Sequence, residues 1–244
     1  MSSYTLITGA SSGIGEGLAI SLSKAKKLIL CGRNEFKLNS VKEKCCSPES
    51  HFVFCSDLEK EKEFLFAKTN EFLITNNITI DSFIHCAGIA TLLPLRSFTV
   101  SYVNEIFDIN FFSSLEIIRA LLKKENKGDL KNIIFLSGLW SIRGDIGNTI
   151  YAASKGAINS LVISLAQELA PRIRVNSVVP GAVMTPMTEK KLSDESSRKV
   201  IEKDYPLGIG GIDDIVNYIE FLLSSKAKWI TGQNLIIDGG RSTK

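Results

Sequence analysis

A tyrosine and a lysine four residues apart, Tyr151 and Lys155, most directly suggest chemistry in this 244-residue chain. They stand in the stretch Tyr151-Ala152-Ala153-Ser154-Lys155, which opens a helical pattern, and a helix would place both side chains on one face. A phenol with an ordinary pKa of about 10 is a poor base at neutral pH, and a nearby ammonium group favours its ionised form. The pair therefore suggests proton transfer by the tyrosine, although this spacing alone also occurs by chance on exposed helices.

A glycine-rich turn near the N-terminus is the second feature with chemical meaning. The stretch Thr8-Gly9-Ala10-Ser11-Ser12-Gly13-Ile14-Gly15 follows a short apolar run and precedes a helical pattern. Glycines there permit a tight turn and bring backbone N–H groups close to a pyrophosphate, and the helix N-terminus adds a favourable dipole. We expect a dinucleotide to bind at Gly9, Ser11, Ser12, Gly13, Ile14 and Gly15; a turn that binds no ligand is the alternative.

The end of the second apolar run bears on which dinucleotide would bind. An acidic residue there would hydrogen-bond the adenosine ribose hydroxyls and repel a 2′-phosphate. This chain has Gly32 at that position, followed by Arg33. A guanidinium can clamp a phosphate and stack on adenine, so the sequence predicts NADP(H) in preference to NAD(H). The alternative is that Arg33 is a solvated residue at a helix start.

The elements that must position these residues alternate along the chain. Short apolar runs rich in β-branched residues predict seven strands: Thr5–Thr8, Lys27–Cys31, His51–Cys55, Asp81–Cys86, Asn132–Ser137, Arg174–Val179 and Asn234–Ile237. Longer amphipathic stretches predict helices at Ile14–Ala25, Asn34–Lys44, Lys60–Asn76, Ser101–Lys124, Tyr151–Ala170 and Ile212–Ser224. This alternation predicts an α/β fold: one doubly wound Rossmann-type domain over residues 1–244, with a seven-stranded parallel sheet, helices on both faces and a ligand at the strands' C-terminal ends.

One insert, residues 185–211, interrupts this alternation. It is polar and charged, and it is bounded by Pro186 and the pair Gly210-Gly211. Long segments of this kind in compact domains are often functional, so we expect a substrate lid over the open edge of the sheet. A solvated surface loop with a short helix is the alternative.

Composition and charge make several other classes unlikely. Lys and Arg total 29 against 26 Asp and Glu, a net charge of +3, which gives no basic footprint for nucleic acid. No apolar run approaches the roughly 20 residues of a membrane-spanning helix, and the N-terminus shows no export signal. Five cysteines without paired spacing predict reduced thiols and no metal site. We therefore expect a cytoplasmic protein without membrane or nucleic-acid partners.

Taken together, the ordered motifs resemble the short-chain dehydrogenase/reductase family. The resemblance extends from Tyr4 to Gly240 and rests on the TGxxxGIG form of Thr8–Gly15, on Tyr151 and Lys155, and on the PGxVxT form of Pro180–Thr185. The length and the closing motif Ile230-Thr231-Gly232-Gln233…Asp238-Gly239-Gly240 are similar to those of 3-oxoacyl-thioester reductases. That closing motif is widespread in the family and specifies a substrate poorly.

The resemblance implies hydride transfer between NADP(H) and a small-molecule carbonyl or secondary alcohol. It implies that Tyr151 exchanges a proton with the substrate oxygen, that Lys155 tunes Tyr151 and binds the nicotinamide ribose, and that Asn110 holds a water for proton relay. A buried structural amide is the alternative for Asn110. It also implies a homotetramer or homodimer. The further cofactor-binding positions that it implies are Asp57, Leu58, Ala87, Gly88, Pro180, Gly181, Val183 and Thr185. Apolar walls for the substrate would come from Leu93, Trp140, Met187, Tyr205 and Leu207.

Two positions depart from the family pattern. The family's substrate-orienting serine usually lies thirteen residues before the tyrosine, and this chain has Gly138 there. Ser137 could supply the hydroxyl through a bulge at the strand end, and Ser141 or a water is the alternative. His85-Cys86 replaces the family's Asn-Asn, and we expect both side chains to pack or hydrogen-bond rather than react. These departures leave open a second interpretation, a dinucleotide-binding sensor or partner subunit with little turnover.

Overall fold

The computed structural model describes residues 2–123 and 129–244 and places the described strands in one parallel sheet. The order across the sheet is β3-β2-β1-β4-β5-β6-β7, so the chain winds outward from β1 in both directions. This is the predicted doubly wound, seven-stranded arrangement. The strands are β1 (Ser2–Thr8), β2 (Leu28–Gly32), β3 (Phe52–Cys55), β4 (Ile78–His85), β5 (Asn132–Leu136), β6 (Arg174–Pro180) and β7 (Asn234–Ile237).

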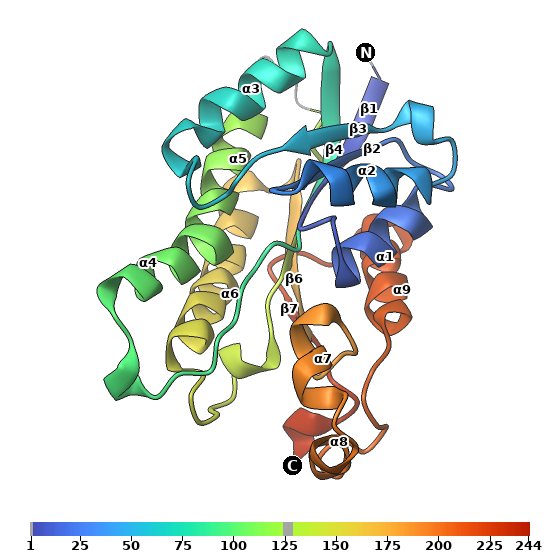
Figure 1. The fold of residues 1–244 in the computed structure, drawn as a ribbon. Coiled ribbons are helices and arrows are strands. Elements are labelled where there is room, and N and C mark those ends of the chain that lie inside the picture. The colour runs from blue at the N-terminus through green and yellow to red at the C-terminus, as the bar shows by residue number, and fades with distance from the viewer. Residues whose placement is uncertain (1, 124–128) are drawn as a thin grey trace.

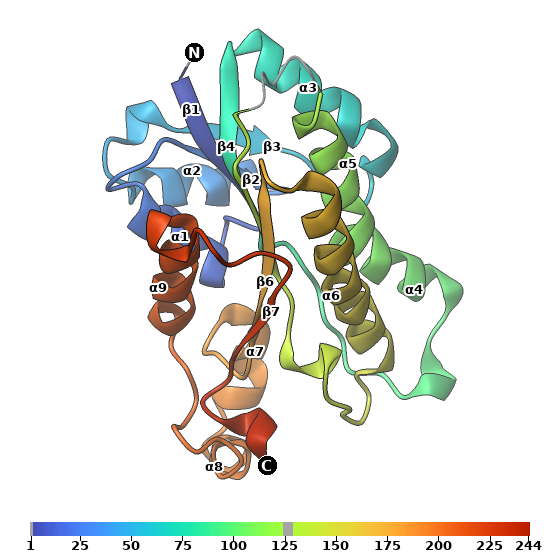
Figure 2. The ribbon, with the colours of Figure 1, turned by 180° about the vertical axis from the view of Figure 1, so that it is seen from behind.

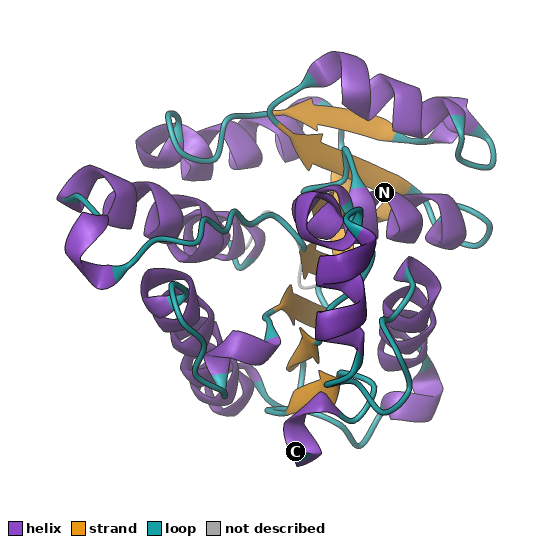
Figure 3. Ribbon diagram, turned by 60° about the horizontal axis from the view of Figure 1, so that its bottom comes forward, coloured by secondary structure: helices purple, strands orange, loops and turns teal. Residues whose placement is uncertain are grey.

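Helices cover both faces of the sheet (Figure 1), and the opposite view shows the same two layers (Figure 2). One face carries α1 (Gly13–Leu22), α2 (Glu35–Glu43) and α9 (Ile212–Leu223). The other carries α3 (Leu65–Thr75), α4 (Val100–Phe107), α5 (Ser113–Leu121) and α6 (Thr149–Leu169). Figure 3 shows the strands between the two groups of helices.

Neighbouring residues of one strand serve two different cores. Phe83 of β4 is fully buried against α5 and α6, whereas Ile84 is fully buried in the core beneath α1 and α9. Ile29 and Leu30 of β2 divide in the same way. Since successive side chains of a strand point to opposite faces, a sheet covered on both faces needs uninterrupted apolar strands, as the sequence shows.

The expected long helix Ser101–Lys124 is wrong as a continuous α-helix. The structure has α4, then a π-helical turn at Asp108–Phe112, then α5, and Lys124 lies outside the described residues. The π-helical turn contains Asn110, whose buried side chain is bonded to the chain beyond β4. Such turns often mark functional positions, and no apolar periodicity reveals them. The other expected elements are present with ends shifted by a few residues.

The 185–211 segment contains two short helices, α7 (Pro186–Leu192) and α8 (Glu195–Glu202), where the sequence suggested at most one. Both lie beyond the C-terminal ends of β6 and β7 (Figure 1). Its two ends meet where Val183 pairs with Gly210 in an isolated bridge. The segment therefore leaves and rejoins the sheet at one place, beside the edge where a doubly wound fold binds its ligand.

No helix in the described part of the chain is long and apolar enough to cross a membrane.

Candidate active site

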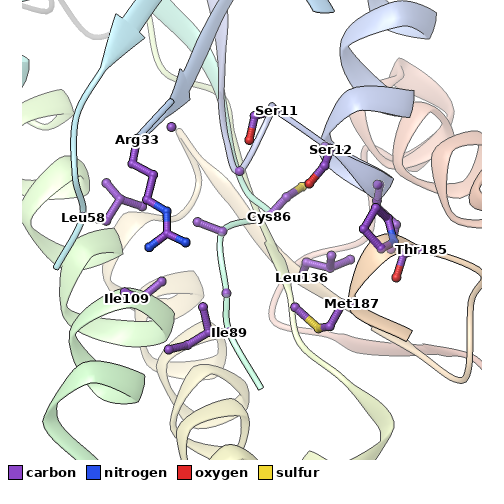
Figure 4. A pocket seen from close by; sticks show the side chains of 18 of the residues that line it. Ser11, Ser12, Arg33, Leu58, Cys86, Ile89, Ile109, Leu136, Thr185 and Met187 are labelled. Carbon is purple, nitrogen blue, oxygen red and sulfur yellow. The ribbon is translucent and has the colours of Figure 1, made fainter. Parts of the chain in front are cut away.

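A cavity of about 290 Å³ opens at the C-terminal ends of β1, β2 and β4 (Figure 4). Most of the residues predicted to bind a dinucleotide line it: Gly9, Ser11, Ser12, Gly13, Ile14, Gly15, Arg33, Asp57, Leu58, Ala87, Gly88 and Thr185. Eight further lining residues were not predicted to bind the dinucleotide: Gly32, Ser56, Cys86, Ile89, Ile109, Leu136, Pro186 and Met187, the last of which was expected to be a wall for the substrate. These belong to strand ends, loops and helices that only the folded chain brings to one place.

The glycine-rich turn has the shape of a phosphate cradle. Gly9 has a φ of +66°, and a Cβ there would lie 2.7 Å from the backbone nitrogen of Ala87. A Cβ on Gly15 would lie 2.2 Å from the carbonyl oxygen of Gly9, so α1 can pack this closely only without a side chain at position 15. Ser12, at the N-cap of α1, makes no capping bond with its side chain. The first N–H groups of α1 are thus open to an anion, and the turn fits a dinucleotide pyrophosphate.

Arg33 extends from the end of β2 toward the middle of the cavity, beside Leu58 (Figure 4). Gly32 lines the cavity next to it and carries no carboxylate that would compete for a phosphate. Asp57, which also lines the cavity, uses Oδ1 to accept the backbone N–H groups of Glu59 and Lys60 at 3.1 and 3.2 Å. Among the residues that line the cavity, Arg33 is the one with a positively charged side chain.

Five of the residues predicted to bind the cofactor do not line the cavity: Tyr151, Lys155, Pro180, Gly181 and Val183. Gly181 lies against β7, and a Cβ there would lie 2.8 Å from the ring of Tyr205. Val183 is buried, and its carbonyl accepts the hydroxyl of Thr188. Thr188 also accepts the backbone N–H of Thr185 at 3.0 Å, which fixes the start of the 185–211 segment at the cavity wall. In the PGxVxT motif, Thr185 lines the cavity, whereas Pro180, Gly181 and Val183 determine the course of the backbone that leads to it.

Tyr151 and Lys155 lie next to each other in the first two turns of α6, as predicted. The Lys155 Nζ atom lies 5.9 Å from the centre of the Tyr151 ring and donates to the carbonyl of Leu136 at 2.8 Å. A Cβ on Gly88 would lie 3.2 Å from that Nζ, so the buried amine lies directly beside a residue that lines the cavity. The Tyr151 hydroxyl makes no hydrogen bond within the described part of the chain.

Burial brings both groups toward their neutral forms. Loss of hydration raises the pKa of Tyr151 to about 12, and it lowers the pKa of Lys155 to about 8. Lys155 is thus charged for the most part at neutral pH, and the phenol keeps its proton. The expected lowering of the tyrosine pKa is absent in this state, because desolvation outweighs the attraction of the ammonium group.

Asn110 joins three separate parts of the site. Its side-chain oxygen accepts the backbone N–H of Ile89 at 2.8 Å, and its Nδ2 donates to the Ile89 carbonyl at 3.1 Å. The same Nδ2 donates to the Ser154 hydroxyl at 3.0 Å, and that hydroxyl donates to the carbonyl of Tyr151 at 2.8 Å. Ser154, which the sequence analysis passed over, thus connects Asn110 to the helix that carries Tyr151. Its place between Tyr151 and Lys155 in the motif was the available signal.

Gly138 faces the Tyr151 hydroxyl. A Cβ at position 138 would lie 2.8 Å from that oxygen, closer than real side chains approach. The Ser137 hydroxyl points elsewhere, toward Ser141 Oγ and the Lys155 carbonyl, both at 3.3 Å. Ser141 in turn accepts from Asn159 at 2.8 Å. Ser137, which was expected to replace the serine of the family pattern, therefore directs its hydroxyl toward Ser141 and the backbone of α6. Gly138, and not Ser137, lies beside the Tyr151 hydroxyl.

His85 and Cys86 occupy the end of β4 without forming a reactive pair. The buried His85 ring bonds to Thr8 Oγ1 at 2.9 Å through Nδ1, and Thr8 Oγ1 also accepts the N–H of Ala87 at 3.3 Å. Burial first and the nearby Lys155 charge second lower the pKa of His85 to about 3. Burial raises the pKa of the Cys86 thiol to about 12, so it is not a ready nucleophile. Both residues pack, as expected.

The apolar residues expected to form walls for the substrate differ in how exposed their side chains are. Trp140 and Leu93 are partly buried, whereas Met187 and Leu207 are exposed. Tyr205 is not a wall for a substrate, because it is 6% exposed and its hydroxyl accepts the N–H of Ala182 at 3.0 Å. Within residues 2–123 and 129–244, no group of three or more His, Cys, Asp or Glu residues could hold a metal ion.

Comparison with known proteins gives consistent matches along the chain. A family model described as enoyl-(acyl carrier protein) reductase matches residues 9–242. An L-xylulose reductase of Caenorhabditis elegans is 35% identical over 245 residues, covering 97% of this chain and 94% of the relative. A 3-oxoacyl-(acyl-carrier-protein) reductase FabG of Rickettsia prowazekii (strain Madrid E) is 35% identical over 240 residues, covering 97% of this chain and 95% of the relative.

Solved structures show the same fold. A 4-hydroxyisoleucine dehydrogenase complexed with NADH superposes with a TM-score of 0.90 at 27% identity and covers 99% of each chain. ElxO with NADP bound superposes with a TM-score of 0.89 at 24% identity over 100% of both chains, a likeness of fold.

The buried His85 predicts an acid-sensitive fold. Its pKa is about 3 when folded against an ordinary value near 6.5, so below pH 6.5 the unfolded chain binds a proton that the folded chain does not. This group should therefore cost about 2 kcal/mol of stability at pH 5 relative to pH 7. Urea unfolding of wild type and His85→Asn at both pH values measures it. The asparagine variant should lose about 2 kcal/mol less on acidification; equal losses would contradict the assignment.

Proposed function

The chain belongs to the short-chain dehydrogenase/reductase family of oxidoreductases, and from that premise we propose that it transfers hydride between NADP(H) and a carbonyl or secondary alcohol, with Tyr151 as acid and base. The observation that carries the proposal is the unpartnered Tyr151 hydroxyl beside the Lys155 ammonium group, next to a cavity shaped for a dinucleotide. A bound nicotinamide would supply or accept the hydride.

The residues of this chain would manage the proton. In reduction, the Tyr151 phenol gives its proton to the substrate carbonyl oxygen, which becomes the hydroxyl of the alcohol, and a phenolate is left on the enzyme. In oxidation, the phenolate takes the hydroxyl proton back. The Lys155 ammonium group stabilises the phenolate by opposite charge in a site poor in water. A tyrosine with a pKa of about 12 begins reduction fully protonated.

The activities for which the relatives are named support a carbonyl substrate. The C. elegans relative is an L-xylulose reductase and the R. prowazekii relative a 3-oxoacyl-(acyl-carrier-protein) reductase, so both are reductases of ketones. These substrates differ in size and polarity. The partly buried Trp140 and Leu93 favour a substrate with an apolar portion near the ketone. We propose a small-molecule ketone or secondary alcohol of this kind.

The first experiment follows the oxidation of NADPH by absorbance across a panel of 3-oxoacyl thioesters, ketoses and diketones. We expect turnover with at least one of them and a loss of about 10²-fold or more in Tyr151→Phe, because general acid catalysis contributes about 10² to 10⁴. Binding of NADPH, followed by its fluorescence, should be retained in this variant. Retained turnover in Tyr151→Phe would contradict the assigned role.

A second candidate function is a dinucleotide-binding sensor or partner subunit with little turnover. Gly138 favours it, because no side chain at that position can orient a substrate oxygen. The positions of Tyr151 and Lys155 favour the enzyme. NADPH binding without turnover on any member of the panel would support the sensor.

Substitutions of Gly138 separate the effect of a steric contact with Tyr151 from the effect of an added hydrogen-bond donor. A methyl group at 138 must displace the Tyr151 oxygen, so Gly138→Ala should lower kcat by about tenfold. Gly138→Ser makes the same contact and adds a donor beside the phenol, so it should exceed the alanine variant by about tenfold or more. Initial rates under saturating NADPH measure both. Full turnover in Gly138→Ala would show that the contact is harmless.

We also propose that Arg33 selects NADP(H) over NAD(H). Arg33 is the positively charged side chain among the residues that line the cavity, at the end where the adenosine would bind. Gly32, next to it, offers no carboxylate to the ribose hydroxyls. Arg33→Asp should weaken NADPH binding by about 10- to 100-fold and change NADH binding by less than about threefold. Lys24→Asp, an equal charge change at an exposed site after α1, is the matched control. An unchanged preference in Arg33→Asp would refute the proposal.

We propose a homotetramer or homodimer as the working assembly. Large apolar side chains are exposed on two parts of the surface, Phe112 and Ile163 beside α5 and α6, and Trp229 and Ile236 near β7. Trp229 is 95% exposed in the single chain, which is unusual for so large an apolar residue. Light scattering of the purified protein measures the assembly, and a monomer would contradict this proposal.

A further inference from the structure

The last described residues, 238–244, form a short strap that follows β7 and lies beside α8 (Figures 1 and 2). The carboxylate of Asp238 shapes it by accepting the backbone N–H groups of Gly240 at 3.0 Å and Ser242 at 2.7 Å. Gly239 and Gly240 have φ values of +58° and +85°, which turn the chain back toward the end of the 185–211 segment. Hydrogen bonds within the strap therefore hold it in a defined turn.

The strap holds the end of the 185–211 segment at three points. Arg241 Nη2 pairs with Asp204 Oδ2 at 2.9 Å, and Lys244 Nζ donates to the carbonyl of Lys203 at 3.1 Å. The backbone N–H of Leu207 donates to the carbonyl of Gly239 at 3.0 Å. These three contacts therefore join the strap to the stretch that follows α8.

The same strap is held from the other side by Arg143. This residue belongs to the 139–148 loop, which runs from β5 to the start of α6 and carries Trp140. Its Nη1 donates to the carbonyl of Arg241 at 2.8 Å and also to the carbonyl of Lys244. Within the described part of the chain, no hydrogen bond or ion pair joins the 139–148 loop directly to the 185–211 segment. The strap makes that connection.

The Arg143 bonds should matter more than the ion pair beside them. Asp204 has 55% of its side chain exposed, and an ion pair so open to solvent contributes little. The Arg143 guanidinium instead meets the backbone oxygens of Arg241 and Lys244, and charged donors make the stronger hydrogen bonds. Arg143 is the residue whose loss would free the loop from the strap.

We propose that Arg143 is a positioning residue that couples the 139–148 loop to the 185–211 segment through the strap and so keeps the substrate side of the cleft assembled beside Tyr151. This inference rests on the proposed function for its link to catalysis. The coupling itself is a property of the fold. The cofactor side has its own anchors, the Thr185–Thr188 bonds and the Val183–Gly210 bridge, so cofactor binding should be largely independent of Arg143.

Steady-state kinetics of Arg143→Ala test the catalytic part, with Arg198→Ala as the control. Arg198 is an exposed arginine of α8 whose nearest carboxylate, on Glu202, is 3.9 Å away. If the assembled cleft falls to about a tenth of the population, the substrate KM should rise about tenfold, while the NADPH Kd changes less than twofold. Arg143→Lys keeps a charged donor and should recover part of the loss. An unchanged KM in Arg143→Ala would overturn the positioning role.

Limited trypsin digestion with NADPH present tests the coupling without any turnover. Cleavage after Lys199 in α8 should be about fivefold faster in Arg143→Ala than in wild type, because the segment opens more often. Equal cleavage rates would overturn the coupling. A protein that binds NADPH but reduces no ketone would refute the proposed enzymatic function alone, since faster cleavage in Arg143→Ala would still establish the strap.

Discussion

The hydrogen bonds of one buried carboxamide, that of Asn110, join the chain beyond β4 to the helix that carries Tyr151. Asn110 accepts the backbone N–H of Ile89 and donates to the Ile89 carbonyl, where the chain leaves β4. It also donates to the Ser154 hydroxyl, which in turn donates to the carbonyl of Tyr151. A buried carboxamide left without partners would cost about 1–3 kcal/mol, so each bond favours this arrangement of strand end and helix. The π-helical turn at 108–112 is the local backbone change that accompanies it. The placement of Tyr151, the proposed acid and base, therefore depends on contacts made with the neighbouring strand end.

Burial, more than charge pairing, sets the electrostatics of the site. Desolvation is the first cause of the shifted pKa of Tyr151, Lys155 and His85, and each shift favours the neutral form. A cleft prepared in this way has a low effective dielectric, in which the remaining charge on Lys155 acts strongly on its neighbour. The Tyr151 phenol, with its raised pKa, therefore keeps its proton at neutral pH.

The two sides of the cleft are built on different principles. The cofactor side rests on strand ends and the first turn of α1, where close backbone contacts at Gly9 and Gly15 leave little freedom. The substrate side is formed by loops and short helices, and these are joined by side-chain contacts such as that of Arg143 with the strap. A rigid sheet edge suits a cofactor of fixed shape, whereas loops can differ between relatives without disturbing the core. This division agrees with relatives of similar sequence that are named for different substrates, an L-xylulose reductase and a 3-oxoacyl-(acyl-carrier-protein) reductase.

The sequence by itself determined the fold class, the seven strands, the glycine turn and the Tyr151–Lys155 pair, because apolar periodicity and glycine spacing are local properties of the chain. The family resemblance implied that the substrate-orienting serine would stand at position 138, and the structure places Gly138 against the phenol oxygen. Only the tertiary structure decided that Ser137 points elsewhere, that Gly181 lies against Tyr205, and that the long helix is broken at Asn110. Side-chain direction at a strand end, the depth of burial and contacts between distant segments depend on neighbours far along the chain. The role of Ser154 and the strap beside Arg143 belong to this second group, since packing alone brings residues 110, 143, 154 and 241 to their partners.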